Sequence, residues 1–440
     1  MTEPRAESSS SSAISALIDT HRPVLAAYEQ FYKTLHADPE LSLQESTTSL
    51  RIKDHLVSLG YEVKTSIGGH GVVGILRNGS GKTVLIRADM DALPIAEATG
   101  LPYSSTKRMV DVADGVEKPV MHACGHDMHC STLLAASELL KGAKAAWSGT
   151  LIMLFQPNEE RAAGAKAMVD DGLYDPSRHD VPKPDIVLGA HIMPARAGTV
   201  QTAGGPFNSA ADSFKITVFG RGGHGSRPHQ AIDPVVMASS IVLKLQTIVS
   251  REMDPRDAVV VTVGSLQAGN AENIIAGEAV LKVNTRTFSE ENRRRVQESI
   301  ERIVRCECEA FRCPQPPKFE SISHFPLLYN DEAVSETVAE AMIDHFGKDD
   351  ESSKGVGFST SPFPSMGSED FSHLSNAVGA PCCFWNYGGI DQKVWDDAKK
   401  NGRIDEIAGT HSALFSPAIH PTMKTAIDAY AAGALAFLKR

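Results

Sequence analysis

Short apolar segments with the character of strands alternate with helical segments along the first half of the chain, and polar residues follow these strands directly. Three cases are Thr83–Arg87 before Asp89 and Asp91, Thr150–Phe155 before Gln156–Glu160, and Asp185–Ala190 before His191. Alternating strands and helices predict a sheet with helices on its faces, and open α/β sheets place their sites beyond the carboxyl ends of the strands. We therefore expect an α/β domain with a functional site along one edge of its sheet.

The alternation is interrupted after Gly204–Pro206 by segments in the order strand, helix, strand, strand, helix, strand. These segments are Phe214–Phe219, Asp233–Ser250, Val259–Val263, Ala279–Thr285, Glu290–Phe311 and Lys318–Ser323. This order, over about 110 residues, is typical of a ferredoxin-like unit with two helices on one face of an antiparallel sheet. We therefore predict one domain formed by residues 13–207 and 325–440, an inserted lid or dimerisation domain at 208–324, and a disordered, serine-rich tail at 1–12.

The run V-M-H-A-C-G-H-D-M at Val120–Met128 is followed by His129 and so combines three histidines with one cysteine and one aspartate. Cys124 and His126 lie two positions apart, separated by Gly125. Thiolate, imidazole and carboxylate form a borderline-soft ligand set that suits Zn²⁺ or a neighbouring first-row metal. A buried structural cysteine beside a capping histidine would explain an isolated C-x-H equally well. The further candidate ligands downstream favour the metal site.

Glu159 and Glu160 are adjacent acids that follow an apolar strand. Because adjacent side chains diverge, one carboxylate can bind a metal while the other acts as general base on a water molecule, which is the division that metal-assisted hydrolysis needs. The alternative is a solvated acidic helix start. His191 and His411 each follow a strand or a glycine-containing loop, and either alone is as consistent with a core histidine. Together, one cysteine, three histidines and one glutamate, four of them just beyond strand ends, favour a metal site.

The pattern G-R-G-G-H-G at Gly220–Gly225 follows a strand and matches the dinucleotide-binding fingerprint. The next residues, S-R-P-H, do not begin a helix, and no strand with a terminal acid follows about 20 residues later. An NAD-dependent enzyme is therefore disfavoured. The glycines instead allow the backbone to present His224 from a loop.

Composition excludes several classes of function. The chain has 43 Lys and Arg against 54 Asp and Glu, a formal net charge of −11, and no basic stripe that would bind nucleic acid or an anionic membrane. It has no apolar run of the roughly 18 residues that a membrane span needs, and no signal sequence. Seven cysteines are an odd and sparse set, so we expect a reducing compartment and a cytoplasmic protein.

A series of motifs occurs in one order along nearly the whole chain. It comprises H-A-D-P-E-L-S-L-Q-E (His36–Glu45), R-A-D-M-D-A-L-P (Arg87–Pro94), M-H-A-C-G-H-D-M-H (Met121–His129), F-Q-P-N-E-E (Phe155–Glu160), G-G-H-G-S-R-P-H (Gly222–His229), D-P-V-V-M-A (Asp233–Ala238), V-N-T-R (Val283–Arg286) and M-G-S-E-D-F (Met366–Phe371). This series closely resembles the amidohydrolase branch of the aminoacylase/carboxypeptidase family of co-catalytic metallopeptidases. The branch includes plant indole-3-acetyl-amino-acid hydrolases, bacterial hippurate hydrolases and bacterial acylglutamine aminoacylases.

The resemblance implies a catalytic α/β sheet domain with an inserted ferredoxin-like βαββαβ lid or dimerisation domain. It also implies one or two divalent metal ions, Zn²⁺ or Mn²⁺ with Co²⁺ or Ni²⁺ as alternatives. Carried over position by position, the implied ligands are Cys124, His126, Glu160, His191 and His411.

The remaining site residues are also implied by the resemblance. Glu159 corresponds to the general base, and Asp91 to an acid that orients a ligand histidine, although Asp89 stands where that histidine is found in sister branches. Asp127 is expected to support a ligand rather than to bind metal. His224 resembles the residue that stabilises the tetrahedral oxyanion, often across a dimer. Asn273 and Arg286 resemble the pair that binds the substrate carboxylate.

Three departures from the family pattern affect the second half of the site. The usual P-A-E-E is P-N-E-E here, the usual N-I-I-P is N-I-I-A at Asn273–Ala276, and a long polar stretch lies between Gly389 and His411. These changes leave the chemistry in place and alter the surroundings of the acyl group.

We therefore expect a homodimeric, metal-dependent amidohydrolase that splits N-acyl-amino acids into a carboxylic acid and a free amino acid. The alternatives are a dipeptidase or carboxypeptidase of the same family, or a non-catalytic binding relative. A binding relative is disfavoured because every implied ligand and the base are present.

Overall fold

The computed structural model describes residues 11–349, 357–361 and 363–439. The chain divides into two compact units, which are described separately. The first comprises residues 1–207, 329–363 and 370–440, and the second comprises residues 208–328 and 364–369. Residues 1–10 of the expected tail lie outside the described residues, and positions 11 and 12 are the first residues of helix α1.

An eight-stranded mixed sheet forms the centre of the first unit, with the strand order β1-β2-β6-β3-β7-β18-β8-β17. Strands β6, β3, β7 and β18 run parallel to one another, and antiparallel strands flank them. The bounds are β1 Glu62–Ile67, β2 Gly71–Asn78, β3 Thr83–Asp89, β6 Gly149–Gln156, β7 Ile186–Arg196, β8 Thr199–Thr202, β17 Gly357–Thr360 and β18 Cys382–Ile390. The parallel centre brings several strand ends to the same edge, as the alternation in the sequence predicts.

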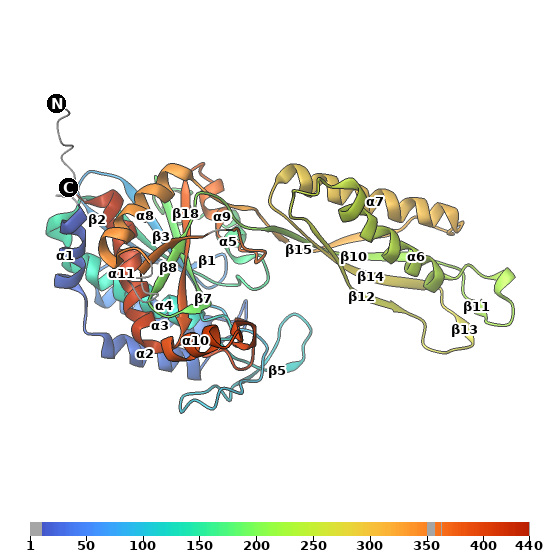
Figure 1. The fold of residues 1–440 in the computed structure, drawn as a ribbon, viewed down its shortest axis with the longest axis horizontal. Coiled ribbons are helices and arrows are strands. Elements are labelled where there is room, and N and C mark those ends of the chain that lie inside the picture. Colours follow the sequence, from blue (N-terminus) through green and yellow to red (C-terminus); the bar gives the residue numbers. More distant parts are fainter. Residues whose placement is uncertain (1–10, 350–356, 362, 440) are drawn as a thin grey trace. The chain divides into compact units, whose positions relative to one another are not determined.

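Helices cover both faces of this sheet (Figure 1). They are α1 Ser11–His21, α2 Leu25–Ala37, α3 Ser46–Ser58, α4 His126–Gly142, α5 Gly164–Asp170, α8 Glu332–Phe346, α9 Ser372–Asn376, α10 Gln392–Lys400 and α11 Ile419–Leu438. Helix α4 is buried on almost every side, because it packs against α2, α11 and strand β3. On the opposite face, α5 and α9 pack against each other, and Phe371 lies against Gly189 of β7. Short elements complete the unit: β4 Arg108–Val110, β5 Glu117–Pro119, β9 Gly205–Asn208, β16 Leu328–Asn330, η1 Lys144–Ala146 and η4 Ile404–Glu406.

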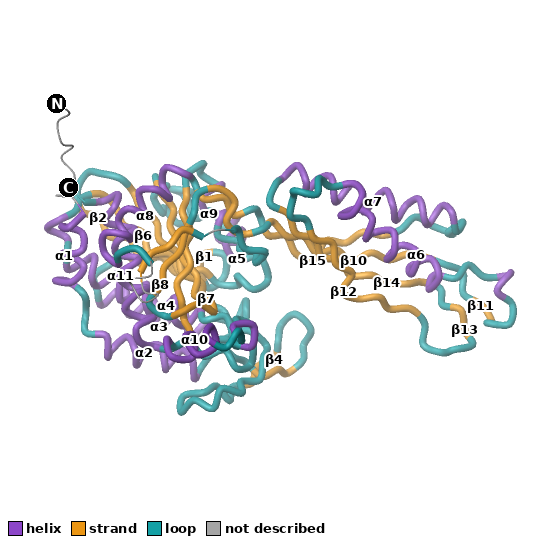
Figure 2. Tube along the Cα trace, viewed as in Figure 1, coloured by secondary structure: helices purple, strands orange, loops and turns teal. Residues whose placement is uncertain are grey.

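The second unit contains a four-stranded antiparallel sheet in the order β12-β14-β10-β15, with two helices on one face (Figure 2). Its elements are β10 Ala210–Phe219, β11 Gly223–His224, η2 Pro228–Gln230, α6 Pro234–Thr247, η3 Ile248–Glu252, β12 Val260–Ala268, β13 Ile274–Ile275, β14 Glu278–Thr287, α7 Glu290–Ala310 and β15 Lys318–Phe325. Apolar residues of both helices, among them Ile241 and Val296, form one core with Ile216 and Leu281 of the sheet. The predicted fold class, an α/β domain with an inserted βαββαβ unit, is confirmed.

No helix in the described part of the chain combines the length and the apolar character that crossing a bilayer requires.

Candidate metal centre

The five side chains predicted as metal ligands lie together in the first unit, at the edge of the sheet where the parallel strands β3 and β6 end. The thiol of Cys124 is central: its Sγ lies 3.4 Å from Nε2 of His191 and 3.2 Å from Nε2 of His411. The carboxylate of Glu160 lies between two of the histidines: one oxygen is 3.4 Å from Nε2 of His411, and the other is 3.9 Å from Nε2 of His126. These separations allow one or two cations to be held between a thiolate, three imidazoles and a carboxylate.

The strand register explains why residues so far apart in sequence meet. Asp89 and Gln156 are directly paired at the ends of the parallel strands β3 and β6, so the segments that follow them start at the same level. On the other side of β3, Arg87 pairs with Gly189 of β7, which places His191 two residues further along. Strand β7 continues to Arg196, six residues beyond the predicted end at Ala190, so His191 lies within the strand rather than after it.

Backbone geometry at Gly125 and His411 brings the cysteine and the last histidine together. Gly125 has φ +80°, and a Cβ there would lie 2.5 Å from Cγ2 of Ile192, so only glycine fits between the two ligands of the C-G-H run. His411 also has a left-handed backbone, with φ +67°. Its amide donates a hydrogen bond to the carbonyl of Ala123 at 2.7 Å, which fastens the His411 loop beside Cys124.

Several buried polar atoms at this centre have no hydrogen-bond partner among the described residues. They are both ring nitrogens of His126 and Oε1 of Glu160. Buried polar atoms without partners are costly and call for a missing ligand. In addition, Nδ1 of His191 donates to the carbonyl of Ile192, so the lone pair of its Nε2 faces Cys124. The side chain of His411 is 55% exposed, which leaves one open side for a substrate.

The electrostatic field also favours a cation. Burial alone would lower the pKa of His126, but the carboxylates of Asp89 and Asp91 raise it to about 10. Burial raises the pKa of the Cys124 thiol well above its usual range, and the nearby glutamates raise it further. Both shifts mean that the site resists additional negative charge and stabilises positive charge. A divalent ion would satisfy this field and release the thiol proton.

Asp91 holds the segment that carries both glutamates. Its Oδ1 and Oδ2 accept hydrogen bonds from the amides of Glu159 and Glu160, each at 3.1 Å. Its Oδ1 also lies 3.4 Å from Nδ1 of His126, which is the contact expected of an acid that orients a ligand histidine. Glu159 itself is almost completely buried beside this contact.

A second group of possible ligands, Asp89, His126, His129 and His191, shares this region. His129 is not available as a ligand, because its Nδ1 bonds to Asp89 at 2.5 Å and its Nε2 accepts the amide of Ile192 at 2.9 Å. Asp89 is further engaged by the fully buried guanidinium of Arg87 at 2.7 Å. Sequence reasoning did not assign roles to Arg87 and His129, although both stand inside the quoted motifs.

Asp127 lies outside the ligand group. Its Oδ2 is 2.7 Å from Nδ1 of His36, and Nε2 of His36 is 3.1 Å from Glu97. Burial alone would lower the pKa of His36, but these two carboxylates raise it to about 10. Asp127 therefore supports the first turn of helix α4, which contains His126, and its carboxylate bonds to His36 rather than to a candidate metal ligand.

In the second unit, His224 ends strand β11 and Asn273 directly precedes strand β13, so the two residues lie close together. His224 pairs with Ile274 across the short β11–β13 ladder, and the amide of Gly225 donates to the carbonyl of Asn273 at 2.8 Å. The amide of Ser226 donates to Nδ1 of His224 at 3.1 Å, so a neutral imidazole carries its proton on Nε2. The exposed His224 therefore presents an N–H donor, as an oxyanion-stabilising residue must.

Arg286 lies at the opposite end of the same sheet. It belongs to strand β14 and pairs with Ala211 and Val260, whereas the β11–β13 ladder adjoins the other end of β14, at Glu278. Eight residues of extended strand separate Glu278 from Arg286, which corresponds to about 26 Å. The expected pair of Asn273 and Arg286 is therefore not formed within one chain. The sequence could not show this, because it depends on the length of β14.

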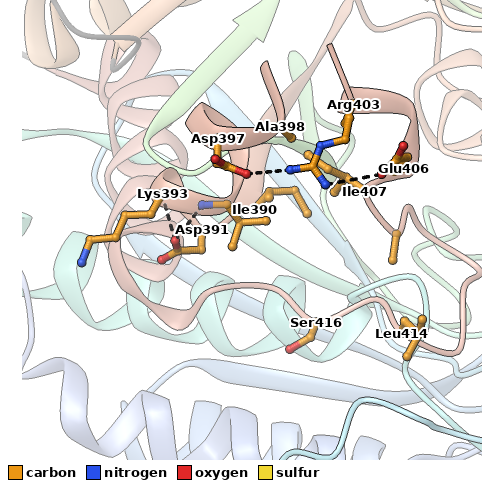
Figure 3. A pocket seen from close by; sticks show the side chains of 12 residues that line it. Ile390, Asp391, Lys393, Asp397, Ala398, Arg403, Glu406, Ile407, Leu414 and Ser416 are labelled. Atoms are coloured by element: carbon orange, nitrogen blue, oxygen red, sulfur yellow. Dashed lines mark hydrogen bonds and ion pairs between the residues drawn. The ribbon is translucent and has the colours of Figure 1, made fainter. Parts of the chain in front are cut away.

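The unusual stretch after Gly389 folds into helix α10 and the short helix η4. Asp391 begins α10 by accepting the amides of Lys393 and Val394, and Arg403 closes the stretch with an ion pair to Asp397 at 2.9 Å. These residues, together with Ile390, Leu414 and Ser416, line a hollow of about 620 Å³. Figure 3 shows how their side chains lie around it. None of the five candidate ligands lines it. The stretch is thus a folded addition next to the His411 loop.

Comparison with known proteins places this arrangement in a family. Residues 85–408 match the model of peptidase family M20/M25/M40. The chain is 38% identical to the hippurate hydrolase of Campylobacter jejuni, over 78% of this chain and 84% of that protein. It is 35% identical to the N-acetyl-L-cysteine deacetylase of Bacillus subtilis, over 81% of this chain and 79% of the relative.

A solved structure shares both the fold and the family. The Bacillus subtilis YXEP protein, described as a dinuclear metal binding peptidase from the M20 family, is 25% identical and superposes with a TM-score of 0.70. The alignment covers 96% of this chain and 98% of that one. The resemblance inferred from the motifs is confirmed: the chain belongs to peptidase family M20/M25/M40.

Proposed function

We propose that this protein is a metal-dependent amidohydrolase that cleaves the amide bond of N-acyl-amino acids, releasing a carboxylic acid and a free amino acid. One observation carries the proposal: Cys124, His126, Glu160, His191 and His411 converge around buried ligand atoms that make no hydrogen bond within the described part of the chain, and the charge of Glu159 is near enough to raise the pKa of Cys124. The relatives named hippurate hydrolase and N-acetyl-L-cysteine deacetylase support the substrate class.

The five ligands would hold one or two divalent ions. Zn²⁺ or Mn²⁺ suits the mixed set of sulfur, nitrogen and oxygen donors, with Co²⁺ or Ni²⁺ as alternatives. When bound, such an ion supplies a Lewis acid that polarises the scissile carbonyl and lowers the pKa of water. Among the described residues, the fit rests on the buried ring nitrogens of His126, which make no hydrogen bond, and on the field that favours positive charge.

Glu159 would act as general base and then as general acid. The amides of Glu159 and Glu160 donate to Asp91, which fixes the backbone from which the Glu159 carboxylate projects. It accepts a proton from the attacking water and passes it to the leaving amine. Adjacent Glu160 remains a ligand, because the two side chains diverge from consecutive backbone positions.

His224, Asn273 and Arg286 would recognise the substrate from two subunits. Because His224 and Asn273 lie at one end of the sheet and Arg286 at the other, a single second unit cannot bring all three to one substrate. We therefore propose a homodimer in which each site combines Arg286 of one subunit with His224 and Asn273 of the other. The imidazole N–H of His224 would stabilise the oxyanion, and Arg286 would bind the carboxylate through its planar fork.

We place the protein in the cytoplasm. All seven cysteines are free, although Cys382 and Cys383 are adjacent and others lie close together on α7. Free cysteines in such numbers are typical of a reducing compartment.

A substrate panel tests the proposal. The protein, loaded separately with Zn²⁺ and Mn²⁺, is incubated with hippurate, N-acetyl-amino acids and a matched set of dipeptides, and free amino acid is quantified. Turnover of acylated amino acids above that of dipeptides supports the amidohydrolase. Preferential cleavage of dipeptides would instead identify a dipeptidase or carboxypeptidase. No turnover with either metal would overturn the proposal in favour of a binding protein.

A further inference from the structure

Three consecutive backbone amides after strand β6 point at two buried carboxylates. The amide of Asn158 donates to Oε1 of Glu45 at 2.8 Å, and the amides of Glu159 and Glu160 donate to Asp91. Asn158 has a left-handed backbone, with φ +56°. A non-glycine residue holds this conformation only where its surroundings impose it. The direction of the Glu159 and Glu160 side chains is therefore set by what accepts these amides.

Both acceptor carboxylates, those of Glu45 and Asp91, are held by the short segment between α2 and α3, residues 38–45. Glu45 is fully buried and supplies the first acceptor itself. The hydroxyl of Ser42 donates to Oδ2 of Asp91 at 2.6 Å and so holds the second. Glu45 Oε1 also accepts the amide of Leu43 at 3.0 Å, which closes the segment on itself. This segment lies before residues 85–408, the part of the chain that matches the family model.

We propose that Glu45, assisted by Ser42, is a positioning residue for the base Glu159 and the ligand Glu160. It acts through the backbone of Asn158 and touches neither a candidate metal ligand nor the reacting atoms. The inference rests on the proposed function. Its physical basis is that a base misplaced by about 1 Å can lose about 100-fold in rate.

The competing explanation is that Glu45 only stabilises the start of helix α3. Glu40 provides a matched control for that role. It is a second buried carboxylate in the same segment, and its side chain accepts the amides of Thr47 and Thr48 at 3.1 and 2.7 Å. The carboxylate of Glu40 caps α3, and its hydrogen bonds go to Thr47 and Thr48 rather than to the amides of residues 158–160. The two glutamates therefore separate helix stability from positioning.

The experiment compares Glu45→Ala, Glu45→Gln and Glu40→Ala in the full-length, metal-loaded protein. We measure kcat and KM for the best N-acyl-amino acid, Tm, and amide hydrogen exchange in a peptide covering residues 156–162. Glu45→Ala should lower kcat by about tenfold or more with KM changed by less than about threefold, and should speed exchange in that peptide.

Rescue by the conservative variant is part of the test. Burial and the nearby Asp91 raise the pKa of Glu45 to about 8, so a neutral glutamine is a close mimic that still offers an oxygen to Asn158. Glu45→Gln should therefore keep kcat within about threefold of the wild type. Glu40→Ala should lower Tm while leaving kcat and exchange at 156–162 close to wild type.

Two results would overturn the positioning role. One is unchanged exchange at 156–162 in Glu45→Ala; the other is an equal loss of kcat in Glu40→Ala and Glu45→Ala at equal loss of Tm. Hydrogen exchange measures the contact between Glu45 and the amide of Asn158 in the absence of substrate. A failure of the positioning role can therefore be distinguished from a failure of the proposed function. A wild type without turnover overturns the proposed function, and faster exchange in Glu45→Ala would still support the contact.

Discussion

Nε2 of His411 lies 3.2 Å from Sγ of Cys124, although 287 positions separate the two residues in the chain. A backbone hydrogen bond lies next to this contact: the amide of His411 donates to the carbonyl of Ala123. The loop that supplies the last candidate ligand is thus fastened directly beside the first. Cys124 also contacts His191, so its sulfur is the atom that the two histidines share.

Replacing this sulfur should remove metal and activity together. We expect Cys124→Ser to lower metal content by at least about tenfold after dialysis, since a serine hydroxyl is a far poorer ligand than a thiolate for Zn²⁺. The secondary structure should persist, because the side chain contributes little to the core. Elemental analysis and circular dichroism measure the two effects.

Cys130 offers the control for this substitution. It is buried on helix α4, six residues after Cys124, and its thiol donates to the backbone carbonyl of Asp89, a bond that serine can also make. Cys130→Ser should therefore keep its metal. Full metal occupancy in Cys124→Ser would remove the thiol from the ligand set.

Glu159→Gln should separate proton transfer from metal binding. Glutamine keeps the shape of the side chain but cannot accept the proton of water. We expect kcat to fall by about 10²–10⁴-fold with metal content unchanged, which is the usual contribution of general acid–base catalysis. Near-normal turnover would assign the base elsewhere. Glu160→Gln is the informative contrast, because it should lose metal as well as rate.

The residue types of the C-G-H run alone indicated a metal site, whereas the full set of candidate ligands was implied by the resemblance of the motifs to a known family. Cys124 and His126 stand two apart in one motif, and Glu160 follows a recognisable strand. The fold class followed from periodicity in the same way. What the sequence could not supply was distance. The separation of Asn273 from Arg286 depends on the number of residues in β14, and element boundaries are the least certain part of a pattern-based prediction.

Contacts between loops also could not be predicted from the sequence. The bond from the Asn158 amide to Glu45 joins positions 113 apart, and nothing in either motif shows that they meet. The polar stretch after Gly389 was recognised as unusual, yet its composition did not reveal that Asp391 caps a helix there. Side-chain caps of this kind depend on local backbone geometry as well as on residue type.

Acid should weaken the second unit through Asp212. Burial alone would raise the pKa of this carboxyl, but hydrogen bonds from His324 and Arg293 lower it to about 2. The folded state therefore binds this proton more weakly than the unfolded state, whose pKa is about 4. The stabilisation is present above about pH 4 and is lost as the pH falls toward 2.

Asp212→Asn tests this linkage. At pH 7 it leaves the buried guanidinium of Arg293 without its main partner, and we expect Tm of the unfolding transition to fall by about 5 °C or more. The difference from wild type should shrink as the pH is lowered from 5 to 3. Glu301→Gln removes an exposed pair with Arg305 on α7 and should change Tm little at any pH. A constant Asp212→Asn deficit across this range would contradict the low pKa.

Mixed dimers test whether each site is built from two subunits. His224→Ala should lower kcat by about 10²-fold through loss of an oxyanion donor, whereas Arg286→Ala should mainly raise KM for substrates with a free carboxylate.

If each site takes His224 from one subunit and Arg286 from the other, a dimer of the two variants contains one site with both residues intact. The other site lacks both. Mixing the two impaired variants under conditions of subunit exchange should then restore activity toward half of the wild-type value per mixed dimer, with wild-type KM. If both residues acted from the same subunit, every site in the mixed dimer would lack one of them. Activity that stays at the sum of the two variants, although exchange is verified with differently tagged subunits, would therefore exclude the shared site.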